Sequence, residues 1–235
     1  MPVKPQRPEI ITADVRPTVC HDVIPMVRQL SFAAGNRLTV GGLKPGTIAT
    51  LAVGATRVES ILGDGRRQVL GFHFKGEQLL QPLPQLEMRH IALTAGVVYM
   101  VNRSDLNRCG NCQFDADGSP DSALRRQLQR MTTQITLLGR CTAMERIAAF
   151  LVDMAYRTGF PGKTGTVIGL PMKREDIADY LGLNSETVSR LFSKLKARRV
   201  IDMPKPGRVI LLDQQVLTGL SPVTAGTLAC QFDAA

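Results

Sequence analysis

The chain has 235 residues, a formal net charge of +9 and a sequence pI of about 9.7. Its hydrophobic content of 44% is typical of a globular protein, and the absence of an apolar run long enough to span a bilayer argues against a membrane protein. The positive charge favours a polyanionic partner. We therefore expect a cytoplasmic protein of two ordinary domains, each with its own core.

The N-terminal half is predicted to be an arm followed by a β-domain. Residues 1–25 are rich in proline and charge and lack the apolar centre of a signal peptide, so we expect a loose arm there. In residues 26–119, short apolar runs alternate with polar ones and with glycine, which predicts an antiparallel β-roll or barrel. Gly63-Asp64-Gly65 predicts a tight hairpin turn. The expected strands are 38–40, 48–53, 56–62, 68–74, 90–93 and 97–101.

Residues 120–143 show apolar positions in alternating steps of four and three. This a/d heptad pattern predicts a long helix paired with its copy in a homodimer. A single helix packed on its own β-domain would carry a similar stripe, so both arrangements stay open. Gly139 weakens the helix near its end and is a candidate hinge, beyond which we expect an amphipathic helix over 144–156. The predicted interface residues are Leu124, Leu128, Met131, Ile135 and Leu138.

The segment 170–196 holds two amphipathic helical patterns that meet at a glycine. Gly182 closes the first, because glycine adopts positive φ readily, and Asn184 is a suitable N-cap for the second. Along the second helix the apolar residues Val188, Leu191, Phe192 and Leu195 share one face. Glu186, Ser189, Arg190 and Ser193 share the opposite face. The pattern predicts a helix-turn-helix whose polar face can read DNA bases.

Residues 200–212 contain two apolar, β-branched runs separated by a Pro/Gly turn. This predicts a hairpin with Lys205 and Arg208 near its tip, and hence a winged helix-turn-helix over 144–217. The basic tip could reach the sugar-phosphate backbone, although a merely structural hairpin would have a similar sequence. For the tail 218–235 we expect a frayed end, as Gly219, Ser221 and Pro222 suggest.

The run from Ile177 to Leu191, followed by the hairpin, resembles the DNA-binding signature of the Crp-Fnr family of bacterial transcription regulators. The Glu-x-x-Ser-Arg form is similar to the Fnr and FixK branch, whereas the Crp branch has Gly in place of the Ser. The resemblance implies that Glu186, Ser189 and Arg190 contact bases of a TTGAT-like half-site present in two inverted copies. Their chemistry agrees, since Arg bonds guanine bidentately and Glu accepts from cytosine N4.

The resemblance also implies the fold and the partners. The expected fold class is α+β, with an N-terminal cyclic-nucleotide-binding-like β-roll as sensor, a long dimerisation helix and a C-terminal winged helix-turn-helix. Expected partners are double-stranded DNA, a second copy and RNA polymerase, with oxygen, redox or nitrogen-oxide status as candidate signals. Contacts to the DNA backbone are predicted for Ser185, Thr187, Ser193, Lys194, Lys196, Lys205 and Arg208.

The competing function classes are an enzyme with a regulatory domain and a pure ligand-binding protein. The sequence has no G-x-S-x-G, H-E-x-x-H or P-loop motif, so we predict neither catalytic residues nor an enzyme. The basic reading face argues against a pure ligand-binding protein. A transcription regulator remains the best interpretation.

The ligand of the predicted sensor is less clearly encoded. Gly76-Glu77 matches one half of the family's cyclic-nucleotide motif, but the later position reads Arg89-His90, without the hydroxyl that should accompany the arginine. A phosphate pocket needs a short donor beside the guanidinium, so the pattern disfavours a cyclic nucleotide.

An iron-sulfur cluster usually needs four thiolates, and the Fnr-type N-terminal cysteine cluster is reduced here to Cys20. Cys109 and Cys112 have the spacing of a redox or metal pair, but ordinary thiols in a loop are the favoured interpretation. Additional ligands would have to come from among Cys20, Cys141, His21, His73 and His90. A dithiol switch and haem on one of the histidines stay open. Our preferred prediction is a β-roll without cofactor or metal, and the alternative is DNA binding that requires a nucleotide, haem or metal/thiol effector.

Overall fold

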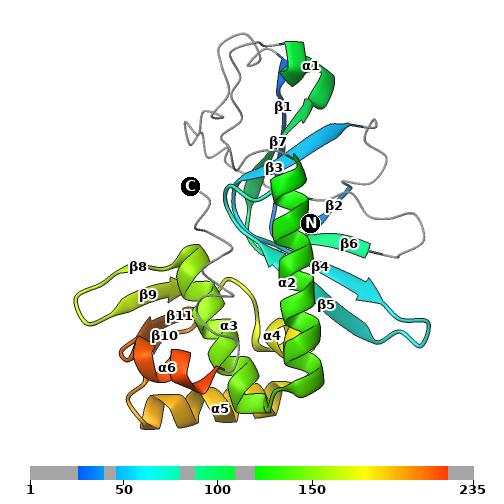
Figure 1. Ribbon diagram of the computed structural model, residues 1–235. Helices are drawn as coiled ribbons and strands as arrows, with labels where there is room; N and C mark the ends of the chain where they lie inside the picture. Colours follow the sequence, from blue (N-terminus) through cyan, green and yellow to red (C-terminus); the bar gives the residue numbers. More distant parts are fainter. Residues whose placement is uncertain (1–25, 40–45, 80–87, 109–119, 222–235) are drawn as a thin grey trace, which may run out of the picture.

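The computed structural model describes residues 26–39, 46–79, 88–108 and 120–221. A β-rich part occupies the top of the molecule, a long helix runs down its front, and helices with a small sheet form the bottom (Figure 1). This confirms the predicted α+β class. The predicted arm 1–25, Cys20, His21, Cys109 and Cys112 lie outside the described residues.

The β-rich part is built from two antiparallel sheets. One has the order β1-β7-β3, with β1 at Arg28–Phe32, β3 at Thr47–Val53 and β7 at Gly96–Asn102. The other has the order β2-β6-β4-β5, with β2 at Arg37–Leu38, β4 at Thr56–Ile61, β5 at Arg67–His73 and β6 at Met88–Ala92. A short helix α1, Arg103–Arg108, follows β7.

The hairpin turn predicted at residues 63–65 is confirmed. It joins β4 to β5, and the Leu62 N–H donates to the Arg66 carbonyl at 2.8 Å. Gly65 has φ +85°, a conformation that other residues rarely adopt. The strand β1 escaped the sequence reading because its first four residues are exposed, so it has no alternation of buried and exposed positions.

Two helices connect the parts of the molecule. Helix α2, Pro120–Arg140, continues through Gly139, so the chain breaks at residues 141–142 and not at the glycine. Helix α3, Ala143–Thr158, begins with a capping box in which Thr142 and Glu145 satisfy each other's backbone amides. Arg146 fixes the junction, because its guanidinium donates to the carbonyls of Cys141 and Leu138, both at 2.9 Å.

The C-terminal part follows α3. It contains β8 (Phe160–Pro161), β9 (Thr166–Gly169), α4 (Arg174–Leu181), α5 (Ser185–Ala197), β10 (Ile201–Lys205), β11 (Arg208–Leu211) and α6 (Gln214–Leu220). The predicted hairpin is β10–β11, with Ile201 opposite Leu211. It belongs to a four-stranded sheet of order β10-β11-β9-β8, whose two short strands β8 and β9 the sequence did not reveal.

The frayed end predicted beyond residue 217 is wrong for residues 218–221, and residues 222–235 lie outside the described part of the chain. Helix α6 extends to Leu220, packs on α3 and is capped by the Asp213 side chain, which accepts from the Val216 N–H at 2.9 Å. Leu217 is fully buried and Ser221 is buried, which gives this segment the tertiary contacts that its composition did not suggest.

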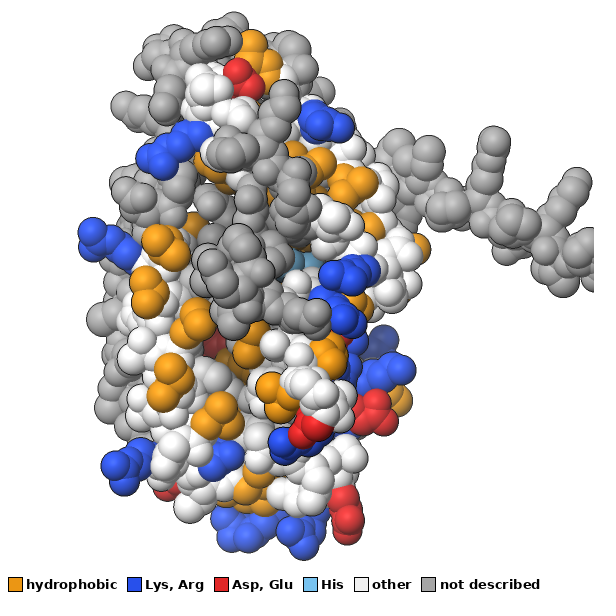
Figure 2. Space-filling view, turned by 90° about the vertical axis from the view of Figure 1, so that its right-hand side faces the viewer, with side chains coloured by type: hydrophobic (Ala, Val, Ile, Leu, Met, Phe, Trp, Pro, Cys, Tyr) orange, Lys and Arg blue, Asp and Glu red, His pale blue; other side chains and the backbone are white. Residues whose placement is uncertain are grey.

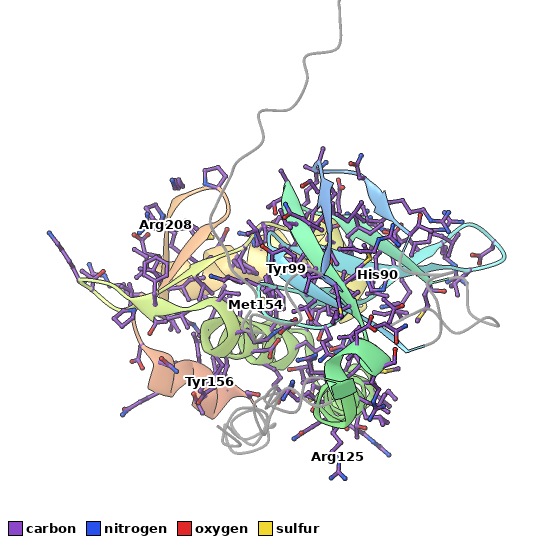
Figure 3. All side chains as sticks on the ribbon, turned by 90° about the horizontal axis from the view of Figure 1, so that it is seen from above. His90, Tyr99, Arg125, Met154, Tyr156 and Arg208 are labelled. Atoms are coloured by element: carbon purple, nitrogen blue, oxygen red, sulfur yellow. The ribbon has the colours of Figure 1, made fainter. Side chains whose placement is uncertain are left out.

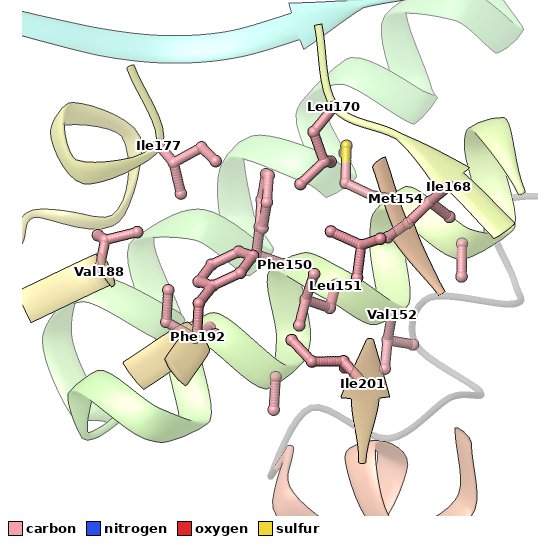
Figure 4. Close-up of a cluster of buried hydrophobic side chains, with 14 of the residues drawn as sticks. Phe150, Leu151, Val152, Met154, Ile168, Leu170, Ile177, Val188, Phe192 and Ile201 are labelled. Atoms are coloured by element: carbon pink, nitrogen blue, oxygen red, sulfur yellow. The ribbon is translucent and has the colours of Figure 1, made fainter. Parts of the chain in front are cut away.

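The hydrophobic core does not divide as the expected pair of domains would. A small cluster lies within the β-rich part, around Leu51 and Val98. The large cluster joins α3, α4, α5 and the C-terminal sheet, as Figure 4 shows around Phe150 and Phe192, and it extends to Val69 and Phe72 of β5. The β-roll and the C-terminal part therefore share buried apolar surface.

A buried ionic cluster lies beside this shared core. The Glu77 carboxylate accepts two hydrogen bonds from Arg157 of α3, at 2.9 and 3.0 Å, and also pairs with Arg130 of α2 at 3.7 Å. Arg157 further donates to Asp153 at 3.0 Å. The carboxylate that resembled half of a nucleotide motif is thus engaged by the protein's own arginines, and it ties the β-roll to both helices.

His73 lies next to this cluster and makes stability depend on pH. Burial lowers the pKa of His73 to about 3 from an ordinary value of 6.5. The nearby Glu77 carboxylate opposes this shift, whereas His90, Arg130 and Arg157 act in the same direction as burial. The unfolded chain therefore binds a proton near pH 6.5, whereas the folded chain does so only near pH 3. In between, the unfolded state binds more protons, so the free energy of unfolding falls with falling pH, by up to about 1.4 kcal/mol per pH unit.

The variant His73→Leu, which cannot titrate, tests this dependence. The free energy of unfolding is measured by urea unfolding at a series of pH values. Below about pH 6.5 it should fall more steeply with falling pH for the wild type than for the variant. Parallel curves for the two proteins across this range would show that His73 is not the group responsible.

Candidate DNA-binding surface

The turn between α4 and α5 has the geometry that the sequence predicts. Gly182 lies in the left-handed region with φ +62°, and its N–H donates to the Ala178 carbonyl, which closes α4. Asn184 caps α5, because its Oδ1 accepts from the Thr187 N–H at 2.7 Å. The two helices therefore meet at a fixed angle across a turn of three residues, Gly182 to Asn184.

One face of α5 anchors it in the core. Val188, Phe192 and Leu195 are fully buried, and Leu191 is partly buried against the same cluster. The guanidinium of Arg174, the first residue of α4, lies 3.7 Å above the centre of the Phe192 ring. The sequence analysis did not identify Arg174, since a charged residue at a helix start has no apolar periodicity to reveal its packing.

The opposite face of α5 points to solvent. Glu186, Ser189, Arg190 and Ser193 are all exposed, and no ion pair among the described residues engages Glu186 or Arg190. The Ser189 hydroxyl donates to the Ser185 carbonyl at 2.9 Å, so its lone pairs remain to accept a hydrogen bond from outside. The helix lies at the lower edge of the molecule in Figure 1, where Lys and Arg side chains gather in Figure 2.

The residues predicted to contact the DNA backbone differ in their exposure and in their neighbours. Ser185, Ser193, Lys194 and Lys205 are exposed, Thr187 is partly buried, and these side chains are accessible beside or along α5 and at the β10–β11 turn. Lys196 differs from them, because its Nζ lies 3.2 Å from the Asp202 carboxylate. Its charge is therefore partly neutralised. We expect Lys196 to contribute less to binding a DNA phosphate than the sequence suggested.

Arg208 lies beside the tip of the wing, as predicted, since it pairs with Lys205 across the two-residue turn. It is partly buried, and its Nε is buried without a hydrogen-bond partner in the described part of the chain. Figure 3 shows it on the β10–β11 side, far from Arg125 on α2. The turn itself is formed by Pro206 and Gly207, which has φ +73°. Contacts of all these residues with DNA stay predictions.

The heptad stripe of α2 faces away from its own protomer. Leu124, Leu128, Met131 and Ile135 are 49%, 56%, 48% and 70% exposed. The inward face of the helix is a different one, with Ala123, Gln134 and Leu137 buried. A column of hydrophobic side chains accordingly runs down the left side of Figure 2, along α2. The alternative of a stripe packed on its own β-roll is therefore wrong for these four residues.

Leu138, the last residue of the predicted stripe, behaves differently. It is partly buried, and its Cδ2 would lie 3.1 Å from a Cβ placed on Gly182. It thus contacts the helix-turn-helix of its own chain, where glycine leaves the space that Leu138 requires.

Known proteins with this sequence pattern and this geometry are transcription regulators. The model of the Crp-like helix-turn-helix domain matches residues 145–220. The nitrogen fixation regulation protein FixK of Rhizobium meliloti (strain 1021) is 36% identical over 171 residues, which cover 72% of this chain and 76% of the relative. The chain belongs to the Crp-Fnr family, as a regulator of the FixK type.

Other relatives of this FixK-type regulator agree. The transcriptional activatory protein AadR of Rhodopseudomonas palustris (strain ATCC BAA-98 / CGA009) is 34% identical over 179 residues, 70% of each chain. The structure of FixK2 from Bradyrhizobium japonicum matches with a TM-score of 0.69 and 31% identity, over 83% of this chain and 97% of that one. A CooA mutant from Carboxydothermus hydrogenoformans, at 20% identity and a TM-score of 0.68, shares the fold.

Within the described residues, the regulator has no group of three or more His, Cys, Asp or Glu side chains that could hold a metal ion. Cys141 is buried at the α2–α3 junction, and burial raises the pKa of its thiol. Of the described helices, none is both long and apolar enough to cross a membrane.

The cap of the reading helix has a measurable effect on stability. Asn184→Ala removes the acceptor of the Thr187 N–H, and we expect a loss of ~1 kcal/mol in the free energy of unfolding. Ser185→Ala, at the adjacent exposed position, is the matched control and should change stability by less than about 0.5 kcal/mol. Equal losses in the two variants by urea unfolding would contradict a specific role of the cap.

Proposed function

We propose that this FixK-type regulator binds, as a homodimer, an inverted repeat of two TTGAT-like half-sites, and that it acts on recruitment of RNA polymerase in the cytoplasm. The observation that carries the proposal is that two separate stripes are exposed on one protomer: the polar face of α5 and the apolar face of α2. The first suits a major groove and the second suits a second copy of the same helix.

Chemistry of the exposed α5 face supports direct readout of bases. Arg190 has no ion-pair partner among the described residues, so its guanidinium is available for bidentate bonds to guanine. Glu186 can accept from cytosine N4 on the complementary strand, and Ser189 offers an acceptor. A two-fold symmetric dimer presents two such faces about one helical turn apart, ~34 Å, which is the spacing of an inverted repeat.

The state of the β-roll supports binding without an added effector. Glu77 is already neutralised by Arg157 and Arg130, so the carboxylate is not available to a ribose hydroxyl without breaking these pairs. The arginines come from α3 and α2, the two helices that lead to the DNA-binding part. The pairs thereby join the β-roll to both helices with the protein's own side chains.

The test is binding by purified, reduced, full-length protein without added nucleotide or metal. Fluorescence anisotropy should give an affinity for a duplex with two inverted TTGAT half-sites at least about a thousandfold higher than for a scrambled duplex. The affinity should fall steeply with salt, as expected for a protein that contacts several phosphates. Binding that appears only after addition of a cyclic nucleotide, haem or oxidant would favour the effector-dependent alternative.

A further inference from the structure

A second ionic cluster joins the β-roll to the first helix of the helix-turn-helix. Arg67 of β5 donates from Nε to the Asp179 carboxylate at 2.8 Å and pairs through Nη2 with Asp176 at 3.1 Å. Arg57 of β4 lies 3.4 Å from the same Asp176 and 2.7 Å from Glu59. Both aspartates belong to α4, so the contacts connect elements more than a hundred residues apart in the chain.

Uncharged contacts join the same elements, β5 and α4. The Gln68 amide donates to the Asp179 carbonyl at 2.6 Å, and the Phe72 ring lies 5.3 Å from the Tyr180 ring. Asp176 is only 3% exposed and also accepts from the Lys173 N–H at 3.1 Å, so its carboxylate has partners on both sides. One face of α4 is therefore held by β4 and β5 through charged, amide and aromatic contacts together.

These contacts complete a rigid connection through the protomer. The β-roll is joined to α2 by Glu77 and Arg130, and α4 is joined to α5 by the turn at Gly182. The stripe by which α2 would meet its copy and the face by which α5 would meet DNA thus belong to one connected body.

We propose that Arg57, Arg67, Asp176 and Asp179, which we name the clasp, are positioning residues that set the orientation of the reading helix relative to α2. In a dimer this orientation fixes the distance between the two reading helices, and hence the half-site spacing that the protein accepts. The inference rests on the proposed dimeric binding. The clasp acts on spacing selectivity and leaves the contacts of each α5 with its own half-site unchanged.

Two variants break the best-placed pair with little change of shape. Asp179→Asn is isosteric and removes the charge that Arg67 binds, and Arg67→Gln removes the partner. Glu175→Gln is the matched control, because it removes the same charge from the same helix at an exposed position outside the clasp. Asp176 is left intact, since it also caps α4.

The full-length proteins are titrated with three kinds of duplex: a single half-site, the inverted repeat with centres one turn apart, and repeats with the spacer changed by a few base pairs. Wild type and Glu175→Gln should prefer the one-turn repeat strongly. Asp179→Asn and Arg67→Gln should keep half-site affinity within about twofold and lose about tenfold of the preference for one spacing, a typical coupling between sites. The double variant should lose no more than Arg67→Gln alone, because Asp179 has no further effect once its partner is removed.

Unchanged spacing preference in Asp179→Asn and Arg67→Gln would overturn the inference. A parallel fall in half-site and repeat affinity would also overturn it, because it would assign the clasp to stability alone. If wild type itself shows no preference for the half-site over a scrambled duplex, the proposed function fails, which is a separate result. Should Arg67→Gln not fold, Asp179→Asn alone decides, since its side chain is partly exposed and keeps its shape.

Discussion

Replacing Ile135 by glutamate should convert the regulator into a monomer and lower its affinity for the inverted repeat by about 10²–10⁴-fold. Ile135 is 70% exposed on a protomer, so a charge there costs little in the folding of one chain. In the proposed dimer the same side chain lies in the seam between two α2 helices, where two unpaired carboxylates would have to be desolvated against each other. The loss in affinity follows because the second half-site is then bound without the gain of a linked partner.

Thr136→Glu provides the control for this experiment. Thr136 is also exposed and adjacent in sequence, but it lies about 100° further around the helix and hence off the seam. Sedimentation equilibrium and anisotropy should show a dimer with wild-type affinity for Thr136→Glu, and a monomer with half-site affinity for Ile135→Glu. A stable dimer of Ile135→Glu would contradict the assignment of this stripe.

Arg190→Ala should cost ~1–3 kcal/mol in binding at the cognate guanine and relax the preference for that base. The reason is that a guanidinium makes two bonds to guanine O6 and N7, which no other base pair offers in the same arrangement. Duplexes with the half-site guanine replaced should bind wild type weakly, whereas Arg190→Ala should bind them and the cognate duplex alike. Competition titrations over the four bases at this position measure the effect.

Lys194→Ala is the matched comparison, because Lys194 is exposed on the same helix and predicted to contact a phosphate. We expect uniform weakening over all sequences and a salt slope smaller by about 1. Lys196→Ala should have a smaller effect, since Asp202 already neutralises part of its charge. If Arg190→Ala weakened all duplexes equally, Arg190 would be a backbone contact and not a base contact.

The helix-turn-helix could be predicted from sequence because its determinants are local. A helix face repeats every three or four residues, and the signals at Gly182 and Asn184 act within one turn of the chain. The same holds for the hairpin at residues 63–65. The heptad stripe was recognised as well, but only the structure decided which way it faces, since a stripe has the same period whether it meets its own domain or another chain.

What escaped the sequence reading depends on pairs that are distant in the chain. Arg67 and Asp179 are 112 residues apart, and Glu77 and Arg157 are 80 apart, so no periodicity links them. Lys196 and Asp202 form an ion pair because β10 packs beside α5. Strands β8 and β9 have two and four residues, too few to show alternation. Strand β9 pairs with the edge of β11, and β8 pairs in turn with β9.

Interference by methylated guanines tests most directly whether α5 enters the major groove at two half-sites. Methylation at N7 blocks the major-groove edge to which Arg190 would bond, whereas the minor-groove edge is left as it was. With the duplex methylated sparsely and bound molecules separated from unbound ones, the half-site guanine on each strand should be strongly depleted from the bound fraction. Bound duplex that carries methylated guanine at both half-sites as often as unbound duplex would contradict readout by this face of α5.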